Sequence, residues 1–337
     1  MNDRFLRTSL PDPLFSANIY CDGFLDEVLR GAVAPFWKEL RRREPKGPGY
    51  LWVVRYGRRG EHLKVRLHGP EEWAGFRALL VESVTICFAA LGAPQEKGRR
   101  SERMDIPPMD EEDAEEGLYP DRTLLWTRYR RSHVSLPAGP YLRDDHFLSL
   151  FTPCLGVACE RTLAAFRPLA DGKAPTSLRR TTLLQGLISG LGTLGWPASE
   201  CCAYLAYHRD WLIRFSLCRN GAHPEQGREI LARFEEQAVR MGAALERLRS
   251  LTRAEWEKDQ QPHASEDPWH DRLAHLAAYL SPLAADPERN IDPYTSNPVF
   301  APLFKVFHGF ANTLGLNAME EGYTHHLLLQ AATMEAA

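Results

Sequence analysis

The stretch that most constrains the fold is residues 51–70, LWVVRYGRRGEHLKVRLHGP. Two runs rich in Val, Leu and aromatic residues flank the loop 57–60, and this pattern predicts a β-hairpin with a short, glycine-bearing connection. Side chains alternate along a strand, so the second strand should place an apolar set on a core. That set is Leu63, Val65 and Leu67, and the opposite face carries His62, Lys64, Arg66 and His68.

The polar face of this hairpin carries two fixed cations and two imidazoles at every second position. Like charges along one strand repel each other, so the pattern costs stability unless an anion or a polar substrate compensates it. Two interpretations stay open at this point. The face is either a binding surface or the solvated outer side of a half-exposed sheet.

Composition excludes several classes of protein. The chain has 337 residues, 44% of them hydrophobic, which is enough for a large core. Its 41 Lys and Arg balance 44 Asp and Glu, a formal net charge of -3, so we expect no nucleic-acid partner. No apolar run approaches the roughly 18 residues of a membrane helix, so we expect no membrane contact. The seven cysteines are scattered without a CxxC pair, which favours a cytoplasmic protein.

The remaining pattern predicts a strand over residues 14–20, a helix over 26–43, a helix over 71–91 and a strand over 123–131. A flexible acidic loop is expected around residues 93–121, where the run MDEEDAEE lies. Helical periodicity follows over 147–166, 176–191, 199–217, 224–251, 269–283, 299–314 and 318–332. We therefore predict an α+β fold over residues 1–337 as a single domain: a mainly antiparallel sheet, with the basic hairpin, packed against many helices.

Familiar cofactor and nucleophile motifs are missing from the sequence, which contains no GxGxxG unit, Walker A loop, HExxH or GxSxG. His325 and His326 are adjacent on a predicted helix, where neighbouring side chains point about 100° apart and cannot chelate one metal together. We therefore expect no metal and no cofactor.

One further segment combines aromatic and titratable groups. On a helix, Tyr204, Tyr207, His208 and Trp211 would form one stripe, because they are spaced i, i+3, i+4 and i+7. The stripe is either a buried aromatic seam, with His208 bonded to a neighbouring carbonyl, or a place where Tyr207 or His208 donates a proton.

Three segments in this order resemble a known family: FSANIYCDGFLDEVLRGAVAPFWKEL, RYGRRGEHLKVR and FHGFANTLGL. They are similar to the thiopeptide-type bacteriocin biosynthesis domain, which is also the C-terminal elimination domain of lanthipeptide dehydratases. In that family a strand of the type RYxxxxxHLRLR lines the reaction pocket, and a helix reading roughly HMHxNR lies near the C-terminus. The resemblance places Arg55, Tyr56, His62, Lys64, Arg66, His308 and Asn312 at the corresponding positions.

Two departures from the family pattern bear on the reaction. Eliminating members hold a glutamyl ester with arginines, whereas this chain has Lys64 in the strand and Thr313 after the helix asparagine. Neither side chain reproduces the planar fork with which arginine binds a carboxylate. The chain also resembles another branch, the cofactor-independent pyridine synthases of thiopeptide maturation. These join two dehydroalanines of a leader-bearing precursor in a formal [4+2] aza-cycloaddition, with loss of water and of the leader peptide as its carboxamide.

This resemblance implies a ribosomally made precursor peptide with an acidic leader as the partner of a monomer or homodimer. The candidate catalytic residues are His308, Tyr207, His208 and Lys64. The candidate substrate-binding residues are Arg55, Tyr56, His62, Arg66, Asn312, Arg58 and Arg59. Two interpretations stay open for the basic residues Arg58, Arg59 and Arg41–Arg43: they either guide the acidic leader into the site or are solvated surface groups. Two alternatives stay open: a glutamyl-elimination lyase that partners a tRNA-dependent glutamylating subunit, and a non-catalytic scaffold for the precursor.

Overall fold

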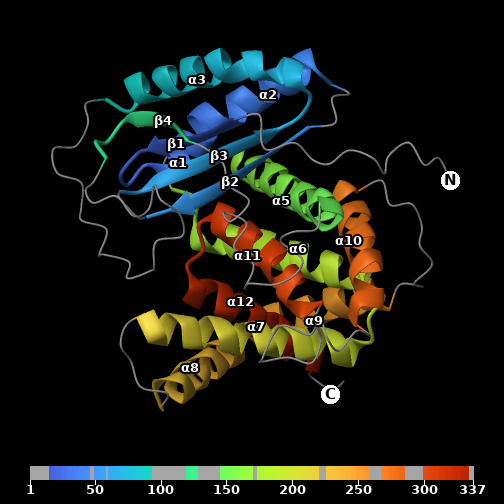
Figure 1. Cartoon of the computed structure of the whole chain (residues 1–337). Coiled ribbons are helices and arrows are strands. Elements are labelled where there is room, and N and C mark those ends of the chain that lie inside the picture. Colours follow the sequence, from blue (N-terminus) through green and yellow to red (C-terminus); the bar gives the residue numbers. More distant parts are fainter. Residues whose placement is uncertain are drawn as a thin grey trace. The chain divides into compact units, whose positions relative to one another are not determined.

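The computed structural model describes residues 15–45, 49–57, 60–92, 119–127, 145–169, 173–219, 225–257, 267–284 and 299–333. The chain divides into two compact units, residues 1–175 and 176–337. Figure 1 shows the first unit with the sheet and the second with helices. Arg58, Arg59 and the greater part of the predicted acidic loop lie outside the described residues. A single domain over residues 1–337 stays a prediction.

A four-stranded antiparallel sheet in the order β2-β3-β1-β4 forms the centre of the first unit. Its strands are β1 (Phe15–Tyr20), β2 (Tyr50–Tyr56), β3 (His62–His68) and β4 (Thr123–Thr127). The β2–β3 hairpin pairs Tyr56 with His62 and Tyr50 with His68. The predicted α+β fold, with an antiparallel sheet that carries the hairpin, is therefore confirmed.

One face of this sheet is apolar and fully buried. Ala17, Ile19, Leu63, Val65 and Leu67 all have 0% exposure. Figure 1 shows helices on one side of the sheet in the first unit. They are α1 (Leu25–Val28), α2 (Ala34–Arg43) and α3 (Arg77–Ala90). Burial of the four branched side chains among these strand residues stabilises the unit by about 1.5–3 kcal/mol for each residue.

The predicted helix over 26–43 contains a π-helical turn, η2 (Leu29–Val33), between α1 and α2. Gly31 lies in this turn, and a Cβ atom there would be 2.9 Å from the sulfur of Cys87 on α3. The close packing of α3 on the turn therefore requires glycine at this position. The predicted helix over 71–91 likewise begins as a 3₁₀ segment, η3 (Glu71–Phe76), before α3.

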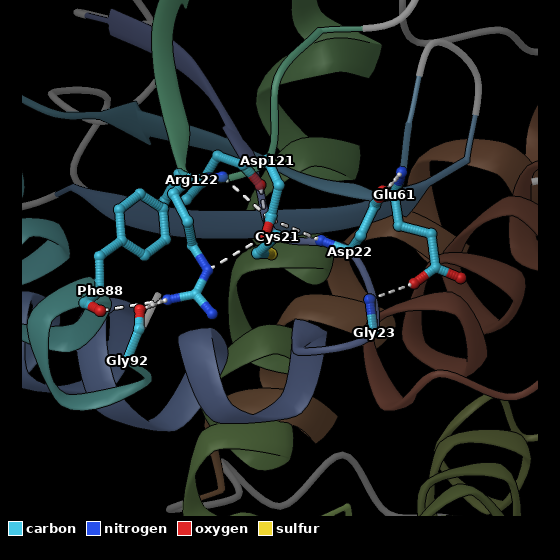
Figure 2. A network of polar contacts seen from close by, with 9 residues as sticks. Cys21, Asp22, Gly23, Glu61, Phe88, Gly92, Asp121 and Arg122 are labelled. Carbon is cyan, nitrogen blue, oxygen red and sulfur yellow. Dashed lines mark hydrogen bonds and ion pairs between the residues drawn. The ribbon is translucent and has the colours of Figure 1, made fainter. Parts of the chain in front are cut away.

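Figure 2 shows a polar network where β1 ends and where β3 and β4 begin. The Asp121 carboxylate accepts the backbone N–H groups of Asp22 (3.0 Å) and Arg122 (2.9 Å). The Asp22 carboxylate accepts a hydrogen bond from the backbone N–H of Glu61 (3.0 Å). The Glu61 carboxylate in turn accepts one from the backbone N–H of Gly23 (2.9 Å). The Arg122 side chain donates to two carbonyl oxygens at the end of α3, at 3.1 and 3.2 Å. These bonds fix the residue at which β3 starts.

Helix α5 (Asp145–Phe166) packs on β2 from the face that carries the polar residues of β3. The Tyr50 hydroxyl and the Thr152 hydroxyl are 2.6 Å apart. A Cβ atom at Gly156 would lie 2.7 Å from the Tyr50 Cβ, so glycine permits this approach. Tyr50 pairs with His68, which places α5 at one end of the polar face.

The described part of the second unit is helical. Its helices are α6 (Thr176–Thr193), α7 (Ala198–Arg219), α8 (Glu225–Met241), α9 (Ala243–Trp256), α10 (Pro268–Ala284), α11 (Phe300–Leu314) and α12 (Ala318–Thr333). The prediction of one continuous helix over 224–251 is wrong, because Gly242 has φ +44 and separates α8 from α9. Helix α12 is buried on all sides over residues 321–328, and it packs on α7.

One segment of the described chain, Trp73–Ala90, is long and apolar enough to cross a membrane by length and composition alone, with mean hydropathy 1.4. It contains Arg77 and Glu82, and a helix that packs on a protein core passes the same test. The expectation of no membrane contact stays a prediction.

Candidate functional site

The polar side chains of β3 are buried, with His62 1%, Lys64 9%, Arg66 3% and His68 5% exposed. The interpretation of this face as a solvated outer surface is therefore wrong. Two fixed cations inside a protein are costly unless other groups compensate their charge.

Aromatic rings of β2 lie beside the charged groups of β3. The Lys64 ammonium is 4.0 Å from the centroid of Tyr56, and the Arg66 guanidinium is 4.4 Å from that of Trp52. His68 stacks on Tyr50 at 4.6 Å with an interplanar angle of 13°. Each cation–π contact attracts the cation to the ring face and holds it in place. The hairpin therefore presents a preorganised row of cations and rings.

The last two residues of β2, Arg55 and Tyr56, lie on opposite faces of the hairpin. Tyr56 lies on the polar face, where its ring also meets His62 edge-on at 5.4 Å. Arg55 pairs with Leu63 and so belongs to the opposite, apolar face. Its guanidinium forms a buried ion pair with Asp26 at 2.6 Å. A substrate-binding role for Arg55 stays a prediction.

The basic run at the end of α2 bonds within the chain. The Arg41 guanidinium donates to the carbonyl oxygen of Gly49 at 2.8 Å. Arg42 and Arg43 both donate to the carboxylate of Glu39, at 2.7 and 2.8 Å. A leader-guiding role for this run stays a prediction.

Burial lowers the pKa of His68 to about 3, and the positive charge of Arg66 adds to the shift. An unfolded histidine titrates near pH 6.5, so below that pH the unfolded chain binds a proton that the folded chain does not. The stability that the neutral ring confers is therefore present above pH 6.5 and is lost as the pH falls towards 3.

We expect His68→Gln to weaken the dependence of the free energy of unfolding on pH below pH 6.5. Between pH 6 and pH 4 the free energy of unfolding of the native chain should fall more steeply than that of the variant, by about 1.4 kcal/mol per pH unit. Urea denaturation at several pH values measures this difference. His275→Gln, at an exposed histidine, should leave the slope unchanged. Parallel curves for His68→Gln and the native chain would contradict the assignment.

A second polar cluster lies in the second unit, between α11 and α12. The His308 Nδ1 is 2.7 Å from the Glu321 Oε2. The Glu321 side chain is 0% exposed, whereas that of His308 is 34% exposed. The imidazole therefore stands at the boundary between the interior and solvent, with a buried carboxylate behind it. Asn312 follows one turn later on α11 and is half-buried.

The aromatic stripe of α7 contacts the same helix. Tyr204 and His208 are both fully buried, and His208 stacks on Phe304 at 4.4 Å with an interplanar angle of 2°. Burial lowers the pKa of His208 well below its ordinary value, and His325 lowers it further, although the backbone of Phe300 opposes the shift. Burial of the aromatic seam is therefore confirmed for these two side chains, whereas the predicted bond from His208 to a neighbouring carbonyl is not, because neither ring nitrogen has a hydrogen-bond partner within the described residues.

Tyr207 is more accessible than its neighbours in the stripe. It is half-buried, and its ring meets that of His208 edge-on at 4.8 Å. Of the two proton-donor candidates on α7, Tyr207 is thus the one with access to solvent. Catalytic roles for both residues stay predictions.

The sequence predictions missed three residues of this cluster: Glu321, His325 and Lys305. His325 Nδ1 donates to the backbone oxygen of Glu321 at 3.0 Å and is fully buried. Burial lowers the pKa of Lys305 to about 8, although Glu321 opposes the shift. Helical spacing in the sequence could have indicated these residues. Lys305 lies three residues before His308 and Glu321 four residues before His325, so each pair shares one face of its helix.

No group of three or more His, Cys, Asp or Glu side chains within the described ranges is arranged to hold a metal ion. The expectation that the chain works without a metal or cofactor stays a prediction.

The fold is similar to that of several solved structures. The pyridine synthase TbtD from thiomuracin biosynthesis is 15% identical with a TM-score of 0.55, and the similarity covers 94% of this chain and 97% of that chain. TsrL is 13% identical with a TM-score of 0.58, over 94% of this chain and 93% of that chain. No family model and no curated protein matches the chain. The resemblance predicted from the sequence is confirmed at the level of the fold.

Proposed function

We propose that this protein forms the central nitrogen heterocycle of a thiopeptide by a [4+2] aza-cycloaddition. The observation that carries the proposal is the similarity to the pyridine synthase TbtD, which extends over 94% of this chain and 97% of that one. Each polar cluster, taken by itself, contains groups of the kind that this chemistry requires.

The reaction requires a proton relay and a means of holding a peptide. One backbone amide must become its iminol, so its nitrogen loses a proton and its oxygen gains one. The resulting C=N–C=C unit adds to a second dehydroalanine, and two carbon–carbon bonds form. The ring hydroxyl then leaves as water, and the leader leaves as its carboxamide. Proton transfer by a positioned side chain contributes about 10²–10⁴ to such a rate.

The described residues divide into two roles. His308 takes the part of proton acceptor, because it is a half-exposed imidazole backed by a buried carboxylate. Lys64 and Arg66 stabilise negative charge on amide oxygens, because nearby aromatic rings hold both cations in place. Orientation of two dehydroalanines by the enzyme contributes on the order of 7–11 kcal/mol more.

The glutamyl-elimination alternative is less well supported by the geometry. The residue after Asn312 is arginine in the eliminating members and is Thr313 here. Thr313 is 3% exposed, and its hydroxyl donates to the carbonyl oxygen of Gly309 at 2.9 Å. This position therefore offers no cation to a glutamyl carboxylate.

Two incubations separate the possible functions. The purified protein is mixed with a linear, dehydrated, azole-bearing precursor peptide, and the products are analysed by mass spectrometry. We expect a macrocycle that has lost water, together with the leader as its carboxamide. In the second incubation the substrate is a peptide with glutamylated Ser or Thr, and release of glutamate from it would instead identify a lyase. A peptide that binds tightly but keeps its mass would identify a scaffold, and either of these results would overturn the proposal.

A further inference from the structure

We propose that Glu321 is a positioning residue that holds His308 with its Nδ1 protonated, so that Nε2 is the atom that accepts a proton from the substrate. This inference rests on the proposed function and deepens it, because it assigns the direction of proton transfer at His308.

The Glu321 side chain is 0% exposed, and its place on α12 favours negative charge. Glu321 lies in the first turn of α12, where the helix dipole and free N–H groups stabilise negative charge. It approaches His308 from a different helix, with 2.7 Å between Oε2 and Nδ1. A charge-assisted hydrogen bond of this length orients the imidazole ring.

The other titratable groups around this pair do not take its place. His325 donates its Nδ1 proton to the backbone oxygen of Glu321, not to the carboxylate. Within the described residues, the second carboxylate oxygen, Oε1, is buried and has no hydrogen-bond partner. The remaining groups that feel this carboxylate or His308 are Lys305 on α11 and Tyr204 and His208 on α7. His308 is thus the side chain that bonds directly to Glu321.

This hydrogen bond decides the chemistry of the ring. A carboxylate only accepts, so the nitrogen that faces it must carry the proton. A neutral imidazole has one protonated nitrogen, which leaves a lone pair on Nε2. As the amide N–H bond breaks, Nε2 gains that proton, and the imidazolium charge is stabilised by Glu321. The imidazolium then returns this proton to the amide oxygen, which completes the iminol.

The experiment compares Glu321→Met and Glu321→Gln with the native chain. The tautomer of His308 is read from ¹⁵N NMR of the full chain without substrate, and kcat and KM are measured with the linear precursor. The native protein should show protonated Nδ1 in its neutral form. Glu321→Met removes the acceptor, so protonation at Nδ1 should be lost and kcat should fall at least tenfold with little change in KM. Glu321→Gln keeps an amide oxygen and should give an intermediate kcat.

The matched control is Glu320→Gln, at the adjacent residue of α12, whose carboxylate accepts the backbone N–H of Asn317. It should change neither the tautomer nor kcat. A native His308 with its proton on Nε2 would overturn the inference even if no Glu321 variant folds. An unaltered kcat in a folded Glu321→Met protein would overturn it as well. Because the NMR measurement needs no substrate, a failure of the proposed cycloaddition is distinguishable from a failure of this inference.

Discussion

Replacing His308 with glutamine should reduce the turnover of a linear dehydrated precursor about 10²–10⁴-fold, because the variant loses the ring nitrogen that accepts a proton. Glutamine has similar volume and remains polar, so the bond to Glu321 can be kept and the packing of α11 on α12 preserved. Single-turnover reactions followed by mass spectrometry measure the loss. Circular dichroism of the variant should match that of the native protein.

The control for this substitution is His275→Gln on α10, because His275 is an exposed histidine of the same unit. Its turnover should equal that of the native chain. If folded His308→Gln protein retains turnover within threefold of the native rate, then His308 does not transfer the proton, and the proton acceptor must be sought elsewhere.

Replacing Asp26 with asparagine should lower the free energy of unfolding by about 3–5 kcal/mol, the cost of breaking a buried ion pair on one side. Asp26 is 2% exposed and pairs with Arg55 at 2.6 Å. Its second oxygen accepts the backbone N–H of Ala174 at 2.8 Å. The neutral side chain would leave the Arg55 guanidinium in an apolar interior without this counter-charge. Urea denaturation measures the change.

Two comparisons test the reason for this loss. The double variant Asp26→Leu with Arg55→Met removes both charges and should recover most of the stability, because no buried charge remains without its partner. Glu39→Gln breaks the contacts of Glu39 with Arg42 and Arg43 at the end of α2, and should barely move the urea midpoint. A small effect of Asp26→Asn, like that of Glu39→Gln, would show that the Arg55 pair does not stabilise the unit.

The hairpin could be predicted from the sequence because a strand has a period of two residues. The alternation of His62, Lys64 and Arg66 with Leu63 and Val65 determines which side chains share a face, whatever covers that face. The helices were predictable for the same kind of reason, because their apolar stripes repeat at helical spacing. Burial of the polar face was not predictable, because alternation is the same whether the polar side meets water or protein.

Two features that the sequence did not predict depend on groups far apart in the chain. The π-helical turn at η2 accompanies the contact between Gly31 and Cys87, and Arg55 is engaged by Asp26 from α1. The break at Gly242 has a different cause. A glycine inside a helical pattern is a local sign of a break, but the prediction gave more weight to the amphipathic stripe that runs through this position. Local sequence patterns thus predicted where helices and strands lie in the chain, but not which side chains of other elements they contact.

The sequence by itself determined most of the elements, their apolar faces and a resemblance that the fold confirms, because these depend on residues within a few positions of each other. Only the tertiary structure decided which charges meet. It set Glu321 against His308, thirteen residues away on another helix, and Asp26 against Arg55 on another element. Electrostatic interaction depends on distance in space and on burial, and neither is encoded in local spacing.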